Sequence, residues 1–178
     1  MKRLSVYKDP LNSYHTRNVE NTCISDYNCG GLALNTFNWY FPWDDDDEYA
    51  APEYTAATLL DCGYELDDVY KILNEEFLDY MLTTIPNLRK LGGPHDKRSF
   101  NERLICFRFY LLETDGLAEQ PFCRFDFDFH YRYYSEEDEC WVEKSGDYPI
   151  HYDCEMTKEW HCGHLCYDSD PIYLALTI

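Results

Sequence analysis

The longest regular pattern of apolar and polar positions lies between residues 66 and 81. Apolar residues recur there at intervals of three and four, which predicts an amphipathic helix of about five turns. The helix is expected to end before Pro86, because the residue preceding a proline disfavours the helical conformation. The apolar positions are Leu66, Val69, Tyr70, Leu73, Phe77, Tyr80 and Met81.

Two shorter helices are predicted before this one. One comprises residues from Pro52 to Asp61, with proline in its opening turn and Gly63 just beyond its end. Residues from Cys29 to about Tyr40 form the second, and Asn28 stands at its N-cap position. The run Asp44–Glu48 between them consists of five like charges, which repel one another and favour a solvated loop.

The second half of the chain changes to strand patterns. Arg103–Leu112 is apolar at nearly every position, which is typical of a strand covered on both faces. Phe122–Tyr134 alternates aromatic with polar residues, so His130 is expected on a polar face. Cys140–Lys144 and Pro171–Ile178 complete the predicted strands. Helices followed by an antiparallel sheet predict an α+β fold.

Composition narrows the class of protein. The chain of 178 residues has no linker-like stretch, so a single domain over residues 1–178 is expected. It has no run of 18 apolar residues and no signal-peptide pattern near its start, which indicates a cytoplasmic protein that does not bind a membrane. Its net charge of −19 repels nucleic-acid backbones, so direct nucleic-acid binding is not expected.

Cys29 has the surroundings of an activated thiol. A helix N-terminus favours the thiolate, which is the nucleophilic form. Gly30 and Gly31 follow directly, and we interpret them as leaving the backbone open to an incoming carbonyl group. Asn28 and Gly30 are therefore candidates for substrate or oxyanion contacts, next to the Cys29 N–H group. The alternative is a half-buried structural thiol on an amphipathic helix.

His130 is the candidate base for this thiol. Of six histidines it alone lies in a clearly patterned strand beyond the helices. Glu143 follows 13 residues later, a separation that a hairpin brings into register, and it is the first candidate to orient the imidazole. Asp128, on the same face as His130, is the second. For His130 and Glu143 the alternative is a place on an exposed sheet face.

Two blocks of sequence resemble a known family. The stretch N-C-G-G-L-A-L at Asn28–Leu34 resembles the D/N-C-S/G-G-L motif that opens the catalytic helix of papain-like enzymes of the NlpC type. D-F-H-Y-R at Asp128–Arg132, with W-x-E-K-x-G at Trp141–Gly146, resembles a strand pair in small papain-like proteins of phages and bacteria. The resemblance implies a papain-like fold with N-terminal helices packed on a C-terminal antiparallel sheet. It also implies Cys29 as nucleophile, His130 as base and Glu143 as the orienting residue.

The function expected from these residues is that of a cysteine peptidase or amidase. Such a thiol hydrolase or acyltransferase acts on an amide or ester of a peptide or other acyl substrate, without a cofactor. The alternative is a non-enzymatic acidic protein, such as a phage-encoded inhibitor of a host defence factor. It would imitate nucleic acid, bind a basic protein partner and act in the cytoplasm of the bacterial host. The lack of an export signal and Asn28 in place of aspartate disfavour a peptidoglycan substrate.

A cysteine- and histidine-rich stretch near the C-terminus is a candidate zinc site. Zinc takes four Cys or His ligands, and a single intervening residue on an extended strand directs two ligands to the same face. The same residues also fit a turn of reduced thiols before the last strand. The candidate ligands are Cys154, Cys162, His164 and Cys166.

Overall fold

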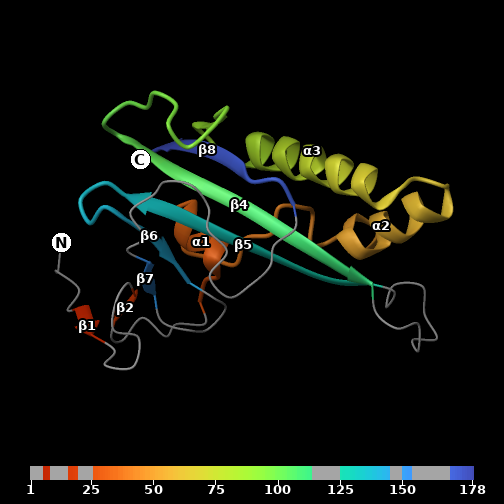
Figure 1. Ribbon diagram of the computed structural model, residues 1–178, viewed down its shortest axis with the longest axis horizontal. Coiled ribbons are helices and arrows are strands. Elements are labelled where there is room, and N and C mark those ends of the chain that lie inside the picture. Colours follow the sequence, from red (N-terminus) through yellow and green to blue (C-terminus); the bar gives the residue numbers. More distant parts are fainter. Residues whose placement is uncertain (1–5, 9–15, 20–25, 114–124, 145–149, 154–168) are drawn as a thin grey trace.

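The computed structural model describes residues 6–8, 16–19, 26–113, 125–144, 150–153 and 169–178 (Figure 1). Helices and strands segregate along the described chain, with most helices first and most strands afterwards. The helical elements are α1 (Cys29–Ala33), the 3-10 turn η1 (Glu48–Ala50), α2 (Pro52–Asp61) and α3 (Leu66–Thr84).

The described strands form one antiparallel sheet with the order β1-β2-β7-β6-β5-β4-β8-β3. Because every neighbouring pair is antiparallel and the helices lie outside the sheet, the fold is α+β, as the sequence predicts. The strands are β1 (Val6–Lys8), β2 (Thr16–Val19), β3 (Leu88–Lys90), β4 (Glu102–Glu113), β5 (Phe125–Ser135), β6 (Cys140–Glu143), β7 (His151–Asp153) and β8 (Ile172–Thr177).

The centre of the sheet is the long pair β4 and β5. Their ladder runs from Leu104 opposite Tyr134 to Glu113 opposite Phe125, and β8 pairs with the other edge of β4. Phe107 and Phe109 of β4 are fully buried. This explains the apolar run in β4, since a central strand is covered on both faces.

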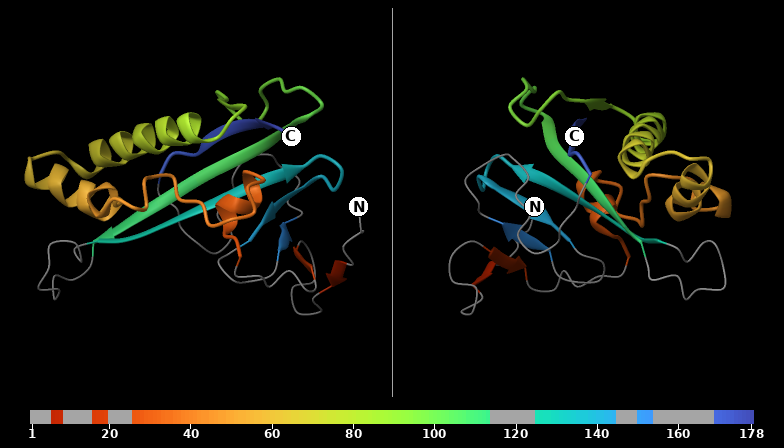
Figure 2. Two further views of the ribbon diagram at one scale, coloured as in Figure 1. Left: turned by 180° about the vertical axis from the view of Figure 1, so that it is seen from behind. Right: turned by 45° about the vertical axis from the view of Figure 1, so that its right-hand side comes forward.

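The helices cover one face of this sheet (Figure 2). Phe77 and Met81 of α3 are buried against Phe107, Phe109 and Tyr131, in the larger apolar core. The Tyr131 hydroxyl donates a hydrogen bond to Met81 Sδ at 3.1 Å. On the opposite face, a smaller core contains Leu104, Cys106, Tyr134 and Trp141.

The amphipathic pattern of α3 is confirmed, and the helix ends before Pro86 as predicted. Its first turn carries Asp67 and Asp68, acidic residues that interact favourably with the N-terminal end of a helix dipole. No helix in the described ranges is both long enough and apolar enough to cross a membrane.

The first helix is shorter than the sequence pattern predicts. The expected helix from Cys29 to Tyr40 is wrong after Ala33, where α1 ends. Asn35 and Phe37 adopt φ angles of 59° and 53°, which a right-handed helix does not contain. Beyond α1 the chain turns back over the helix, because the Thr36 and Phe37 N–H groups both donate to Gly31 O.

Candidate functional site

Cys29 opens α1, and Asn28 caps the helix as expected. Asn28 Oδ1 accepts hydrogen bonds from Gly31 N at 3.0 Å and from Tyr40 N at 3.1 Å. Its Nδ2 group donates to Tyr40 O at 2.9 Å. Asn28 therefore ties the start of α1 to the returning chain, and its side chain is engaged in structural bonds rather than turned toward an oxyanion.

The glycines after Cys29 have a role that the sequence interpretation missed. A Cβ atom added at Gly31 would lie 1.9 Å from Asn38 O, and one at Gly30 would lie 2.9 Å from Tyr40 O. The space beside both residues is thus filled by the backbone of the returning chain. Gly30 and Gly31 permit close packing of protein on α1, and our interpretation that they leave the backbone open to a substrate is wrong.

The other end of α1 is held by Arg103 of β4. Its Nη1 group donates to Leu32 O and Ala33 O, both at 3.2 Å. A cation at this position interacts favourably with the C-terminal carbonyls of a helix. The guanidinium also lies over the Tyr133 ring, 4.1 Å from its centre. Burial lowers the pKa of Arg103, while the nearby Tyr133 raises it.

His130 and Glu143 are brought together by the β5–β6 hairpin. Glu143 pairs with Arg132 in the ladder, and side chains two residues apart on a strand share a face. Glu143 consequently meets both His130 and Arg132. Its Oε2 atom lies 2.8 Å from His130 Nε2 and also accepts a hydrogen bond from Arg132 Nε.

The Cys29 thiol lies near the His130 imidazole, where the pairing between β5 and β6 ends. β6 pairs with β5 only from Arg132 to Ser135, so His130 lies just past the paired segment. α1 packs on both strands here, and the nearby Cys29 raises the pKa of His130. His130 Nε2 faces Glu143.

The charges of this cluster stabilise one another. Burial alone would lower the pKa of His130, but hydrogen bonds and charge interactions with Cys29 and Glu143 raise it to about 9. Burial would raise the pKa of Glu143, but His130 and Arg132 lower it to about 2. At neutral pH the site therefore contains a carboxylate beside an imidazolium.

Asp128, the other candidate for the orienting role, has a different contact. Its Oδ1 atom accepts a hydrogen bond from the Phe129 N–H group at 2.8 Å. Glu143 is the carboxylate that hydrogen-bonds His130. Cys29 and His130 themselves are nearly buried, with 6% and 5% of their surfaces exposed.

The zinc candidates Cys154, Cys162, His164 and Cys166 lie outside the described residues. Within the residues that the structure does describe, no group of three or more His, Cys, Asp or Glu side chains is arranged to hold a metal ion. None of the four described cysteines, Cys29, Cys62, Cys106 and Cys140, forms a disulfide.

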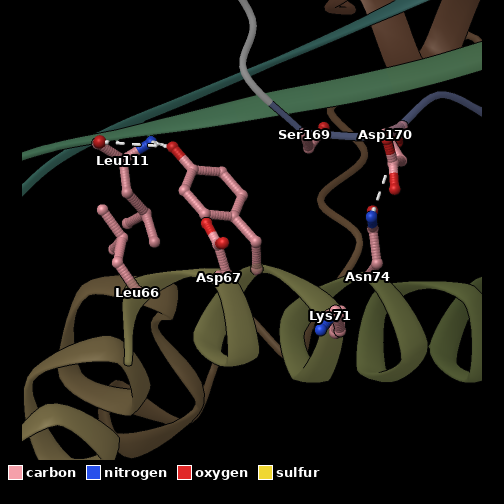
Figure 3. A pocket seen from close by; sticks show the side chains of 8 residues that line it. Leu66, Asp67, Lys71, Asn74, Leu111, Ser169 and Asp170 are labelled. Carbon is pink, nitrogen blue, oxygen red and sulfur yellow. Dashed lines mark hydrogen bonds between the residues drawn. The ribbon is translucent and has the colours of Figure 1, made fainter. Parts of the chain in front are cut away.

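A pocket of about 440 Å³ lies elsewhere, between α3 and the ends of β4 and β8 (Figure 3). Tyr70 lines it, and its hydroxyl donates to Leu111 O and accepts from Leu111 N. Asn74 reaches Asp170 O across it. None of the candidate catalytic residues lines this pocket.

Arg132, Arg103 and Tyr40 belong to the site but escaped the sequence prediction. The position of Arg132 two residues after His130 was a usable signal for a shared face, since strand side chains alternate. Arg103 and Tyr40 act on α1 through backbone groups, and a sequence pattern carries little information about such contacts.

Comparisons with protein-family models, with curated proteins and with solved structures found no match for this chain.

Proposed function

We propose that this chain is a papain-like thiol hydrolase or acyltransferase that acts on an amide or ester. The observation that carries the proposal is the cluster of Cys29, His130 and Glu143. A thiol, an imidazole and a carboxylate from three separate elements meet in the order that thiol acyl transfer requires. The cysteine opens a helix and the histidine lies on a strand, as in the papain-like proteins that the sequence resembles.

The chemistry follows from the two ring nitrogens of His130. Nδ1 takes the proton of the Cys29 thiol, while Glu143 holds Nε2 and balances the charge of the imidazolium. The thiolate attacks the carbonyl carbon of the substrate and forms a tetrahedral intermediate. This intermediate expels the amine or alcohol, which leaves with the proton of His130. The acyl group remains on Cys29 as a thioester.

The second half of the reaction releases the acyl group. Water, or an amine in the case of a transferase, loses a proton to His130 and attacks the thioester carbonyl. The carbon–sulfur bond breaks, and the thiolate returns to its pairing with the imidazolium. Glu143 keeps the ring in one orientation through both steps, a positioning role that depends on its ionised state.

The test is the rate of alkylation of each cysteine by iodoacetamide against pH, read by mass spectrometry. Cys62 is exposed and serves as the ordinary thiol in the same molecule. We expect nearly buried Cys29 to react faster than Cys62 at pH 6.5, below the usual thiol pKa of about 8.5. This order should reverse in His130→Ala. A Cys29 that is slower than Cys62 at every pH in the wild type would contradict the proposal.

A second candidate function is favoured by the distribution of burial and charge. The thiol and imidazole are nearly covered, whereas Asp44–Asp47 are exposed on a chain with a net charge of −19. A non-enzymatic, phage-encoded inhibitor of a host defence factor has such a surface, which binds a basic partner in place of nucleic acid. Its binding should weaken steeply with added salt and persist in Cys29→Ala. Loss of binding in Cys29→Ala would count against it.

A further inference from the structure

The chain that returns over α1 presents aromatic side chains to solvent. Phe37 and Trp39 are 55% and 48% exposed, and Trp39 stacks on Phe41 with ring centres 6.4 Å apart. We call Phe37, Trp39 and Phe41 the aromatic ledge. The Trp39 and Phe41 rings are in contact, and Phe37 is exposed on the same segment two residues before Trp39. Clustered exposed apolar groups mark binding surfaces more often than single exposed residues do.

The aromatic ledge is fixed to the helix that carries the nucleophile. Asn28, directly before Cys29, bonds both the N–H and the carbonyl group of Tyr40, between Trp39 and Phe41. Gly31 admits the Asn38 carbonyl against α1, and Phe37 N donates to Gly31 O. Phe37 also packs edge-on against Tyr27, with ring centres 5.6 Å apart. A group bound on this ledge is consequently held at a set position relative to Cys29.

The inner side of the same segment is anchored in the core. Phe41 contacts Trp43 and Phe129, and Trp43 contacts Phe77 of α3. The Tyr40 hydroxyl hydrogen-bonds the Thr84 hydroxyl at the end of α3. The exposure of Phe37 and Trp39 is thus a property of a well-held segment, and their rings offer rigid apolar area at little cost in conformational entropy.

Negative charge next to the aromatic ledge favours a cationic binding partner. Asp44–Asp47 follow Trp43 directly and are exposed. Burial raises the pKa of Tyr80 in α3, and the nearby carboxylates of Asp44, Asp45 and Asp46 raise it further. The acidic run therefore lies near α3. Two of the aspartates also shape the loop, because Asp44 accepts from Asp46 N and Asp47 accepts from Tyr49 N. A cationic partner complements this surface, whereas a second copy of a chain with a net charge of −19 is repelled.

We propose that the aromatic ledge binds a bulky apolar side chain of a polypeptide substrate, and that Asp44–Asp47 bind lysine or arginine farther along the same polypeptide. The inference rests on the proposed function, because it makes this surface the substrate-binding surface of the Cys29 site. It narrows the acyl substrate to a basic polypeptide with an aromatic or large aliphatic residue.

The test measures binding to Cys29→Ala protein, so that its outcome does not depend on catalysis. Three fluorescent peptides of equal length are used: one with phenylalanine and two lysines, one with phenylalanine and two glutamates, and one with alanine and two lysines. We expect the first peptide to bind about tenfold more tightly than either of the others, as loss of one interface anchor commonly costs this much.

Surface variants then locate the binding. Phe37→Ala with Trp39→Ala should remove the preference for phenylalanine, whereas Phe100→Ala, which removes a fully exposed aromatic ring elsewhere, should not. Asp45→Asn with Asp46→Asn should remove the preference for lysine and leave the two loop-shaping aspartates intact. The control with the same loss of charge is Asp67→Asn with Asp68→Asn in α3.

The outcomes separate this inference from the proposed function. Equal affinity for the three peptides, absence of saturable binding, or equal effects of the ledge and control variants would overturn the inference. Self-association in sedimentation experiments that is lost with Phe37 and Trp39 would also overturn it, in favour of a second copy as the occupant. The alkylation rate of Cys29 in wild-type protein is measured in parallel, and it alone decides whether the thiol is activated.

Discussion

Arg132 and His130 donate hydrogen bonds to the same oxygen atom, Oε2 of Glu143. One carboxylate thus balances two cations in a site that is largely closed to water. Because Glu143 is ionised and accepts only, His130 Nε2 must carry a proton, and the orientation of the ring follows. The arrangement makes Arg132 part of the machinery that holds His130 in place.

Removal of Arg132 should therefore affect both stability and the site. In Arg132→Gln the carboxylate of Glu143 loses one of its two cations, and we expect the free energy of unfolding to fall by about 3 kcal/mol. The pKa of His130 should rise, because Glu143 then acts on the imidazole alone. Urea unfolding measures the first effect and the pH profile of Cys29 alkylation the second. Arg132→Lys keeps the cation, and an equally large loss there would contradict this account.

The charge states of the site predict a pH-dependent stability. Glu143 has its pKa lowered to about 2, so its contribution is full above its ordinary value and is lost as pH falls through the folded value. His130 has its pKa raised to about 9, so its contribution is full below about 6.5 and is lost as pH rises toward 9. Near pH 6 both contributions are present, the loss for Glu143 lying at lower pH and the loss for His130 at higher pH. The difference in melting temperature between wild type and Glu143→Gln should consequently be largest there. Exposed Glu137→Gln is the control, and a flat difference for Glu143→Gln would refute the assignment.

Gly31 should tolerate no side chain. In Gly31→Ala the new Cβ lies 1.9 Å from a backbone oxygen, so the returning chain must move away from α1. We expect a loss of about 3 kcal/mol in the free energy of unfolding, at the upper end of overpacking effects, and slower alkylation of Cys29. Gly93→Ala is the matched control, because a Cβ there has open space around it. Similar stabilities for the two variants would show that the returning chain is not packed as described.

Asn28 should not be replaceable by aspartate, although aspartate caps helices equally well. In Asn28→Asp the two accepting bonds survive, but the group that donates to Tyr40 O becomes an acceptor facing an acceptor. We expect a loss of about 2 kcal/mol at neutral pH, which shrinks on acidification as the new carboxyl gains a proton. Urea unfolding at pH 7 and pH 4 tests this. Wild-type stability at pH 7 would contradict the role assigned to the Asn28 amide.

Local patterns predicted much of the fold because they depend on neighbouring residues. The helix expected at Pro52–Asp61 is confirmed at both ends, since proline and Gly63 mark its limits. The alternation before Tyr134 placed His130 and Arg132 on one face, and the hairpin register brought Glu143 to them. These features can be predicted from the side-chain periods of strands and helices and from the length of the turn between two strands.

The parts of the site that were not predicted depend on the path of the backbone after α1. The residues after Ala33 favour a helix by composition, but positive φ angles at Asn35 and Phe37 turn the chain back. Because of this turn, Gly30 and Gly31 pack tightly against the returning chain and do not leave the backbone open. Neither Arg103 on the carbonyls of α1 nor Asn38 beside Gly31 leaves a periodic trace in the sequence.

The three candidate catalytic residues emerge from the ribosome far apart in time. Cys29 opens a helix of five residues, which is too short to persist alone, and His130 and Glu143 belong to a hairpin made much later. β4, the strand that supports β5, gains its second neighbour only when the C-terminal strand β8 has been synthesised. A growing chain therefore carries Cys29 before its imidazole partner exists, and the order of synthesis itself delays their pairing until β5, β6 and β8 have been made.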